Sequence, residues 1–285
     1  MFCIHHNDLD GRAAARVVAV AEWNFDPDRY FEADYVKEIP LEKISKDEKV
    51  YIVDYSFTEA TLETLRKIFE ITQNVVWIDH HDSSKELVEK YPELQTSGVH
   101  INLAVSGAAL TYMILHNVGY HDVPMYLKYI TDYDCWLYKY GKKTEYFKCY
   151  MDTRDYTPFA EVWDLFEKAS DKVLDSIISQ GEIIRRYLAN IYKEILDNFS
   201  YVVNVEDADG VYHEALVVNY EGNSWVFGDM FNTFDICILW NFDGKNYRYS
   251  LYSYDSRVDV SKIAEMYQGG GHANAAGCVS GERIW

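Results

Sequence analysis

The most informative stretch of the chain is Asn74-Val75-Val76-Trp77-Ile78-Asp79-His80-His81, where an apolar run ends in a carboxylate and two imidazoles. Consecutive apolar residues of this kind predict a strand that is buried on both faces. Polar groups at the end of such a strand are costly to bury unless they are paired or bound to a metal. One imidazole can then bind a metal while its neighbour faces a substrate. A satisfied polar corner is the alternative interpretation of the same residues.

Strand and helix patterns alternate through the first half of the chain. Short β-rich runs occupy residues 2–5, 49–54 and 74–79. Helical patterns occupy residues 12–23, 58–71, 106–117 and 123–132. This alternation predicts βαβ units and a parallel sheet that is covered by helices on both faces. Because ligands bind such sheets at the carboxyl ends of the strands, the polar residues that follow the three runs are expected to converge.

The pattern changes in the second half of the chain. Apolar residues at helical spacing predict one long helix over residues 171–199. Alternating β character follows at 201–203, 214–218, 236–240 and 247–252, and a helical pattern at 260–267. The predicted fold is therefore a parallel-sheet α/β domain (1–150), a helical linker (151–199) and a smaller α+β domain (200–285).

The charge of the chain restricts its partners. The formal net charge is −19 for 285 residues, which argues against a long duplex, since duplex affinity comes mainly from lysine and arginine contacts to phosphates. An acidic protein still binds a small anion where metal ions supply positive charge. We therefore expect a short or small phosphorylated substrate.

The sequence also indicates a compartment. Its apolar runs are too short to cross a membrane, and its first residues lack the pattern of a signal peptide. Its five cysteines are odd in number and form no Cys-x-x-Cys pair, as expected of reduced thiols. We expect a cytoplasmic protein that binds no membrane, with a homodimer as an alternative to a monomer.

The first polar segment places His6, Asp8 and Asp10 at alternate positions. In an extended segment this spacing puts the three side chains on one face, where they suit a divalent cation. The alternative is a polar turn in which Asp10 caps the following helix. His5 competes for the histidine role, and the alternation with the two aspartates favours His6.

Single aspartates complete the set of candidate ligands. Asp54 ends an apolar run and is either a ligand or a cap at the strand end. Asp132 and Asp134 lie on either side of Tyr133 after a helical pattern. One of these two is a candidate for the last ligand, and the other for a group that orients a metal-bound histidine.

A glycine run near the other end of the chain, Gly269-Gly270-Gly271-His272, has the composition of an anion cradle. Glycines allow backbone N–H groups to approach a phosphate, and the small residues 273–277 would let the start of a helix pack closely. The adjoining histidine makes this interpretation more specific than a simple turn.

In their order along the chain, these motifs resemble those of the DHH/DHHA1 phosphoesterases, and most closely those of the nanoRNase (oligoribonuclease) B type. The residues that carry the resemblance are His6-Asn7-Asp8-Leu9-Asp10-Gly11, Asp54, Asp79-His80-His81, Asp132 and Gly269-Gly270-Gly271-His272. The resemblance spans nearly the whole chain.

The resemblance implies two manganese ions, with magnesium or cobalt as alternatives. One ion would take His6, Asp8 and Asp54, and the other would take Asp10, Asp54, His80 and Asp132, so that Asp54 bridges. His81 would face the scissile phosphate, and Asp54 and Asp79 would be catalytic with it. His272 and the three glycines before it would hold the substrate.

One departure from the family pattern concerns substrate recognition. The family has an arginine in a Ser-Leu-Arg-Ser-like strand, whereas this chain has Ser250-Leu251-Tyr252-Ser253. Arg257 is the nearby cation that would substitute for that arginine.

The resemblance predicts a manganese-dependent phosphodiesterase that trims short oligonucleotides to mononucleotides. Alternatives are a cyclic- or linear-dinucleotide phosphodiesterase and a phosphatase for 3′-phosphoadenosine 5′-phosphate. A non-catalytic nucleotide-binding module is the alternative from a different class. Because histidine ligands must be neutral, activity is expected to fall as the pH drops toward ~6.

Overall fold

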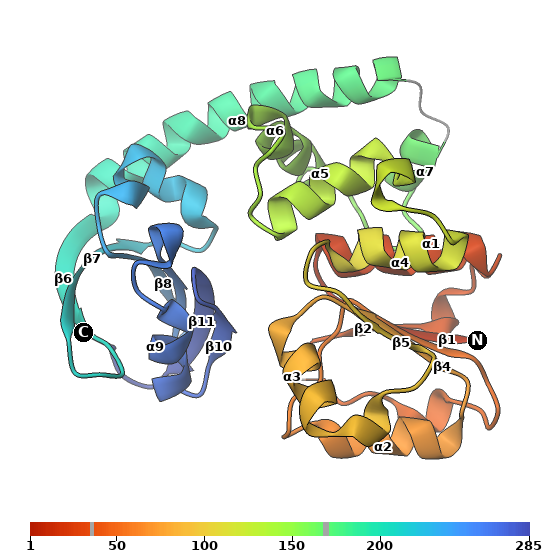
Figure 1. Ribbon diagram of the computed structural model, residues 1–285. Helices are drawn as coiled ribbons and strands as arrows, with labels where there is room; N and C mark the ends of the chain where they lie inside the picture. Colours follow the sequence, from red (N-terminus) through yellow and green to blue (C-terminus); the bar gives the residue numbers. More distant parts are fainter. Residues whose placement is uncertain (35–36, 168–170) are drawn as a thin grey trace. The chain divides into compact units, whose positions relative to one another are not determined.

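A computed structural model describes residues 1–34, 37–167 and 171–285. The described chain forms two compact units, residues 1–184 and residues 185–285, each with its own β-sheet (Figure 1). The predicted fold class, a parallel-sheet α/β domain followed by a smaller domain with a second sheet, is confirmed. The domain boundaries at residues 150 and 199 stay a prediction.

The sheet of the first unit has five parallel strands in the order β2-β1-β3-β4-β5. The strands are β1 (Phe2–His6), β2 (Tyr30–Ala33), β3 (Val50–Val53), β4 (Val75–Asp79) and β5 (Val99–Ile101). The predicted strands are the three central ones. Strands β2 and β5, which are short and lie at the two edges of the sheet, were not predicted.

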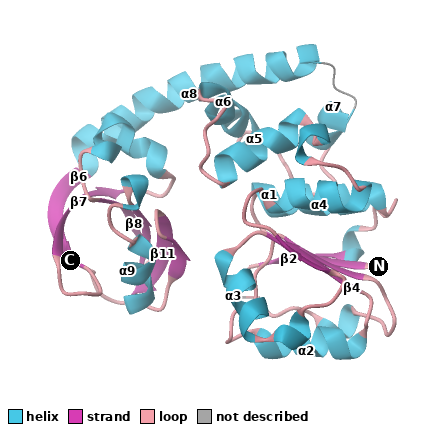
Figure 2. Cartoon of the chain, in the orientation of Figure 1, coloured by secondary structure: helices cyan, strands magenta, loops and turns pink. Residues whose placement is uncertain are grey.

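Helices cover both faces of this sheet (Figure 2). On one face lie α1 (Leu9–Ala21) and α4 (Gly107–His116), and on the other α2 (Leu62–Ile71) and α3 (Asp82–Lys90). The two faces have separate cores, with Ile78 of β4 in one and Trp77 in the other. Strand β4 is therefore buried on both faces, as its apolar run predicted.

Further helices pack on the α1 and α4 side of the first unit. They are α5 (Met125–Asp134), α6 (Lys142–Met151) and α7 (Val162–Glu167). Trp163 of α7 and Ile177 of the long helix α8 (Asp171–Phe199) belong to the core on this side. Single 3₁₀ turns occur at Pro27–Arg29, Leu41–Lys43, Pro92–Leu94 and Tyr120–Asp122.

The second unit has a six-stranded sheet in the order β10-β11-β9-β8-β7-β6, in which β7 and β8 are parallel and the other neighbours antiparallel. The strands are β6 (Ser200–Glu206), β7 (Tyr212–Asn219), β8 (Ile236–Phe242), β9 (Tyr247–Tyr252), β10 (Gly270–His272) and β11 (Ala275–Ser280). Helix α9 (Val260–Met266) packs on one face, and residues of α8 and of the 3₁₀ segment Ser224–Asn232 pack on the other. A further 3₁₀ turn is Tyr254–Ser256.

The glycine run does not lead into a helix, and that prediction was wrong. Strands β10 and β11 instead form an antiparallel hairpin. A Cβ atom at Gly269 would lie 2.1 Å from the carbonyl oxygen of Gly277, and one at Gly271 would lie 2.6 Å from that of Ala275. Glycine is required here because two strands approach closely.

The described helices include none that is both long and apolar enough to cross a membrane.

Candidate metal centre

The carboxyl ends of the central strands bring the predicted ligands together. His6 ends β1, Asp54 follows β3, and His80 follows β4. Three groups of side chains offer ligand atoms that lie within 4.8 Å of one another in each group: His6, Asp8 and Asp54; Asp54, His80 and His81; and His80, Asp134 and Cys135. Asp54 and His80 each belong to two groups, so the three groups form one continuous cluster.

Asp54 lies at the middle of this cluster. Its side chain is 2 % exposed, and its Oδ1 atom lies 3.1 Å from Nε2 of His80. This oxygen accepts no hydrogen bond from the described residues. The backbone of Asp54 has φ +52°, a left-handed conformation that costs on the order of 1–3 kcal/mol and is concentrated at functional sites. The turn after β3 thus holds a strained, buried carboxylate with one oxygen that accepts no hydrogen bond from the described part of the chain.

The start of α4 positions two of the carboxylates. Asp10 accepts hydrogen bonds from the backbone N–H groups of Gly107, at 2.6 Å, and Ala108, at 3.1 Å. A Cβ atom at Gly107 would lie 2.5 Å from Cβ of Asp54. Gly107 therefore allows the first turn of the helix to approach both carboxylates, a role that sequence analysis missed.

We expect Gly107→Ala to disturb the site and the fold together. The added methyl group would displace Asp54, at a cost of about 1–3 kcal/mol in the free energy of unfolding. A shift of about 1 Å in a catalytic group typically costs about 10²-fold in rate. Urea unfolding and turnover of a dinucleotide measure the two effects. Gly281→Ala is the control, because a Cβ atom there meets no heavy atom within 4 Å, and equal effects of both variants would contradict this role.

Asp79 and His81 form a pair beside the cluster. Asp79 is completely buried, and its Oδ1 lies 2.7 Å from Nδ1 of His81. Its Oδ2 accepts a hydrogen bond from the hydroxyl group of Ser84, in the first turns of α3. Although burial opposes ionisation, the charge and hydrogen bond of His81 lower the pKa of Asp79. Asp79, predicted to be catalytic, is placed to orient the ring of His81.

The structure brings Asp134, and not Asp132, to the cluster. Oδ2 of Asp134 lies 3.3 Å from Nε2 of His80. The carboxylate of Asp132 instead accepts hydrogen bonds from the backbone N–H groups of Lys139, at 2.8 Å, and Tyr140, at 3.1 Å, and from the hydroxyl group of Thr144. The two aspartates lie two residues apart on α5, about 200° around the helix axis, so they face different surroundings.

The carboxylates of the cluster carry more negative charge than its histidines can neutralise. Burial and then the charges of Asp10 and other carboxylates raise the pKa of Asp54 well above its usual range. Burial and the charge of Asp10 raise the pKa of Asp134 to about 7. Although burial opposes it, a hydrogen bond with Cys135 and the carboxylate charges raise the pKa of His80 to about 10. Protons or cations are therefore needed to neutralise the site.

The donor set fits divalent cations. Nε2 of His80 lies 3.1 Å from an oxygen of Asp54, 3.3 Å from one of Asp134 and 3.7 Å from one of Asp10. Ligands that share one cation at about 2.1 Å lie roughly 3.0–3.5 Å apart. Carboxylates with imidazole suit manganese, magnesium and zinc.

At the other end of the cluster, Nδ1 of His6 lies 2.9 Å from Oδ2 of Asp8. His5 is instead buried, with its Nδ1 hydrogen-bonded to the carbonyl oxygen of His6.

The predicted substrate-binding residues lie in the second unit. His272 is exposed at the end of β10. Arg257 donates a hydrogen bond to the carbonyl oxygen of Asn232 at 2.9 Å and lies over the ring of Tyr254. Tyr252, at the position of the family arginine, packs in an aromatic cluster whose nearest ring centroid, that of Phe227, is 6.3 Å away.

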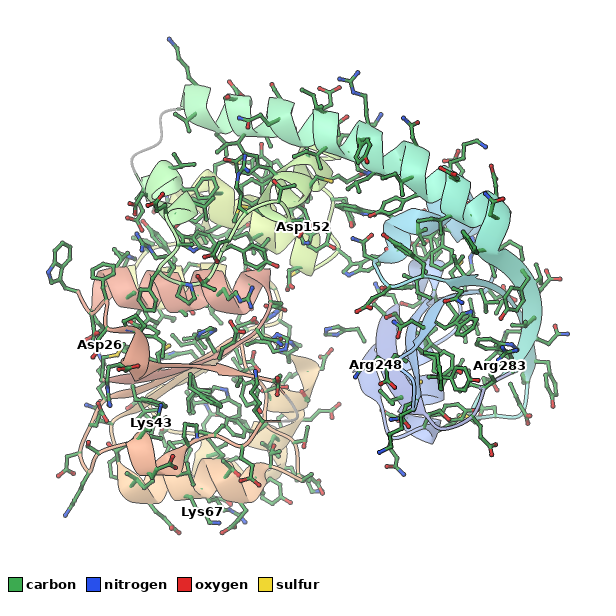
Figure 3. All side chains as sticks on the ribbon, turned by 180° about the vertical axis from the view of Figure 1, so that it is seen from behind. Asp26, Lys43, Lys67, Asp152, Arg248 and Arg283 are labelled. Carbon is green, nitrogen blue, oxygen red and sulfur yellow. The ribbon has the colours of Figure 1, made fainter. Side chains whose placement is uncertain are left out.

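A hollow of about 890 Å³ lies within the second unit. Gly269 of the glycine run lines it. Polar side chains of the neighbouring strands also line it: Asn241 of β8, and Arg248 and Ser250 of β9. Figure 3 shows Arg248 on this unit. Arg248 was not among the predicted residues. It lies on the same face of β9 as Tyr252, since the two are four residues apart.

Comparisons with known proteins identify relatives of similar sequence and fold. No family model matches the chain. Oligoribonuclease NrnB of Bacillus subtilis is 25% identical over an alignment that covers 98% of this chain and 73% of that protein. An uncharacterized mimivirus protein, R106, is 26% identical over 83% of this chain, and the chain spans about half, 54%, of its length.

Two solved structures share the fold. The pGpG-specific phosphodiesterase PggH from Vibrio cholerae has a TM-score of 0.57 at 16% identity and covers 99% of this chain and 94% of its own. A DHH domain from a member of the s1p family of ribosomal proteins has a TM-score of 0.58 at 15% identity, covering 98% of this chain and 82% of its own.

The motifs, the fold and these relatives together confirm the predicted resemblance to the DHH/DHHA1 phosphoesterases, which are hydrolases. Within that class the resemblance is to the nanoRNase type, because the match to oligoribonuclease NrnB runs over nearly the entire chain.

Proposed function

We propose that the protein is a metal-dependent phosphodiesterase that hydrolyses short oligonucleotides to mononucleotides. The observation that carries this proposal is the cluster of carboxylates and histidines around the buried Asp54, in a chain that resembles an oligoribonuclease. The net charge of −19 favours a short substrate over a long one. In this proposal residues 1–150 are the catalytic DHH domain and residues 200–285 the substrate-binding DHHA1 domain.

Two divalent ions, manganese by resemblance, would be held by the cluster. One proposed ligand set consists of His6, Asp8 and Asp54. Asp54 also belongs to the second set. Asp10, Asp54, His80 and Asp134 form the other, with Asp134 in the place that sequence analysis gave to Asp132. When bound, such ions lower the pKa of a water molecule and offset charge on the phosphate.

His81 is the group that we assign to proton transfer. Its ring is held through Nδ1 by Asp79, which is itself held by Ser84. A histidine oriented in this way stabilises negative charge on a phosphate or donates a proton to the leaving oxygen. Asp79 contributes by fixing the position of this ring.

A product assay with manganese tests the proposal. The panel contains RNA and DNA of two to six nucleotides, a long single strand, the linear dinucleotide pGpG, cyclic dinucleotides and 3′-phosphoadenosine 5′-phosphate. Rapid release of mononucleotides from the shortest oligomers supports the proposal. Equal turnover of long and short strands contradicts the preference for short substrates. A clear preference for pGpG or a cyclic dinucleotide supports the dinucleotide phosphodiesterase instead, and no turnover of any substrate supports a binding module.

Arg248 is expected to bind the substrate in the second unit. Arg248 lines the hollow, and its ion pair with Asp243 is exposed and contributes little to stability. Arg248→Ala is expected to raise KM about tenfold and to change kcat less than about twofold, because a hydrogen bond to a charged group is worth about 1.5–3 kcal/mol. Steady-state kinetics on a dinucleotide check this. Arg257→Ala is the comparison, and a larger rise in KM for that variant would restore the role predicted for Arg257.

A further inference from the structure

Cys135 lies at the metal centre, although no cysteine was among the predicted ligands. It follows Asp134 directly at the end of α5. Its Sγ atom lies within 4.8 Å of the ligand atoms of both His80 and Asp134.

The end of α5 explains this position. The backbone N–H of Cys135 donates to the carbonyl oxygen of Thr131 at 2.9 Å, so the residue still follows the helix. Trp136 then takes a left-handed conformation, with φ +54°, and the chain turns away. Asp134 and Cys135 are thereby held as adjacent donors beside the same imidazole.

A second observation indicates that this place takes a ligand. Oδ1 of Asp54 is buried and accepts no hydrogen bond from the described residues. The same oxygen lies 3.1 Å from Nε2 of His80, the imidazole to which Cys135 and Asp134 are also adjacent. Asp54, Asp134 and Cys135 are thus donors around the same imidazole, and the buried oxygen of Asp54 among them is unsatisfied.

We propose that Cys135 is a thiolate ligand of the metal ion that His80 and Asp134 hold. The bond between sulfur and the metal forms as the thiol proton is released to solvent. Thiolate favours softer cations, so the site binds cobalt, zinc or cadmium more tightly than a set of oxygen and nitrogen donors alone. This inference rests on the metal centre of the proposed function and adds a determinant of its metal preference.

Anaerobic titration with Co²⁺ tests the proposal directly. A near-ultraviolet thiolate-to-cobalt charge-transfer band is expected in the wild-type protein and is expected to be lost in Cys135→Ser. Cys237→Ser is the matched control, because Sγ of Cys237 donates to the carbonyl oxygen of Phe231 in the second unit, and a hydroxyl group can replace it there. The affinity for Cd²⁺ is expected to fall at least about tenfold in Cys135→Ser, and that for Mn²⁺ less than about threefold.

Two outcomes separate this inference from the proposed function. Wild-type protein that binds Co²⁺ and hydrolyses a dinucleotide without the charge-transfer band overturns the role of Cys135 and leaves the phosphodiesterase intact. If the band is present in the wild-type protein and lost in Cys135→Ser, Cys135 is a ligand. If that wild-type protein also turns over no substrate of the panel, the proposed phosphodiesterase function is overturned. A band that persists in Cys135→Ser also overturns the inference.

Discussion

Replacement of Asp54 with asparagine is expected to reduce dinucleotide hydrolysis by at least about 10³-fold. Asp54 is the carboxylate shared by two of the ligand groups, so its loss weakens both proposed ion sites. Charge stabilisation by metal ions is worth several kcal/mol, and about 1.4 kcal/mol corresponds to a tenfold change in rate. The measurement is kcat/KM with saturating Mn²⁺, together with Mn²⁺ binding by calorimetry.

Asparagine is chosen because the fold should survive the change. Asn tolerates the left-handed conformation that Asp54 adopts, whereas alanine does not. The amide also removes a carboxyl group whose ionisation is disfavoured by burial and by the charge of Asp10. In the presence of a chelator, the variant is therefore expected to be at least as stable as the wild-type protein in thermal unfolding. Wild-type turnover in a folded variant would show that Asp54 is not a ligand.

The second large effect is a contrast between the two neighbouring aspartates of α5. Asp134→Asn is expected to reduce activity by about 10²-fold or more through loss of a metal ligand. Asp132→Asn is expected to leave the ligands in place and to lower the free energy of unfolding by about 1–3 kcal/mol, since its carboxylate satisfies the N–H groups of Lys139 and Tyr140. Activity and urea unfolding of the two variants, measured side by side, check the contrast. Loss of metal binding in Asp132→Asn alone would restore the assignment that the family resemblance implies.

The stability of the metal-free protein is expected to depend on pH through Asp134. The pKa of Asp134 is raised to about 7 in the folded protein, so the folded state holds a proton that the unfolded state has released. The associated stability is present below about pH 4 and is lost as the pH rises through about 7. In the presence of a chelator, the free energies of unfolding of Asp134→Asn and of the wild-type protein should therefore be closer near pH 5 than at pH 8. At pH 8 the variant should be more stable than the wild-type protein by roughly 2 kcal/mol. Thermal unfolding at the two pH values measures this, and a wild-type advantage that grows with pH would contradict it.

Much of the architecture could be predicted because its signals are local. The apolar run before Asp79 is long enough to indicate a strand buried on both faces, and the helical periodicity of residues 171–199 predicts α8 with its observed bounds. Strands β2 and β5 could not be predicted from periodicity because each is short and lies at a sheet edge. The candidate ligands after β1, β3 and β4 followed from one rule of parallel sheets, that their carboxyl ends meet at a common edge.

Contacts between distant segments could not be predicted in this way. The role of Gly107 depends on how closely α4 approaches the turn after β3. The choice between Asp132 and Asp134 depends on their angular positions around α5 and on the loop that reaches back to one of them. The glycine run has the composition of an anion cradle, and only strand pairing shows that its small residues serve a hairpin.

The sequence by itself determined the class of fold, the order of the motifs and the chemical types of the candidate ligands, because strand burial and residue chemistry are properties of short segments. Tertiary structure alone decided which of two aspartates reaches His80, which arginine lines the hollow and whether a thiol joins the cluster. These choices depend on distances of a few ångströms between segments far apart in the chain. Such distances are set by the packing of the whole unit, and no local pattern encodes them.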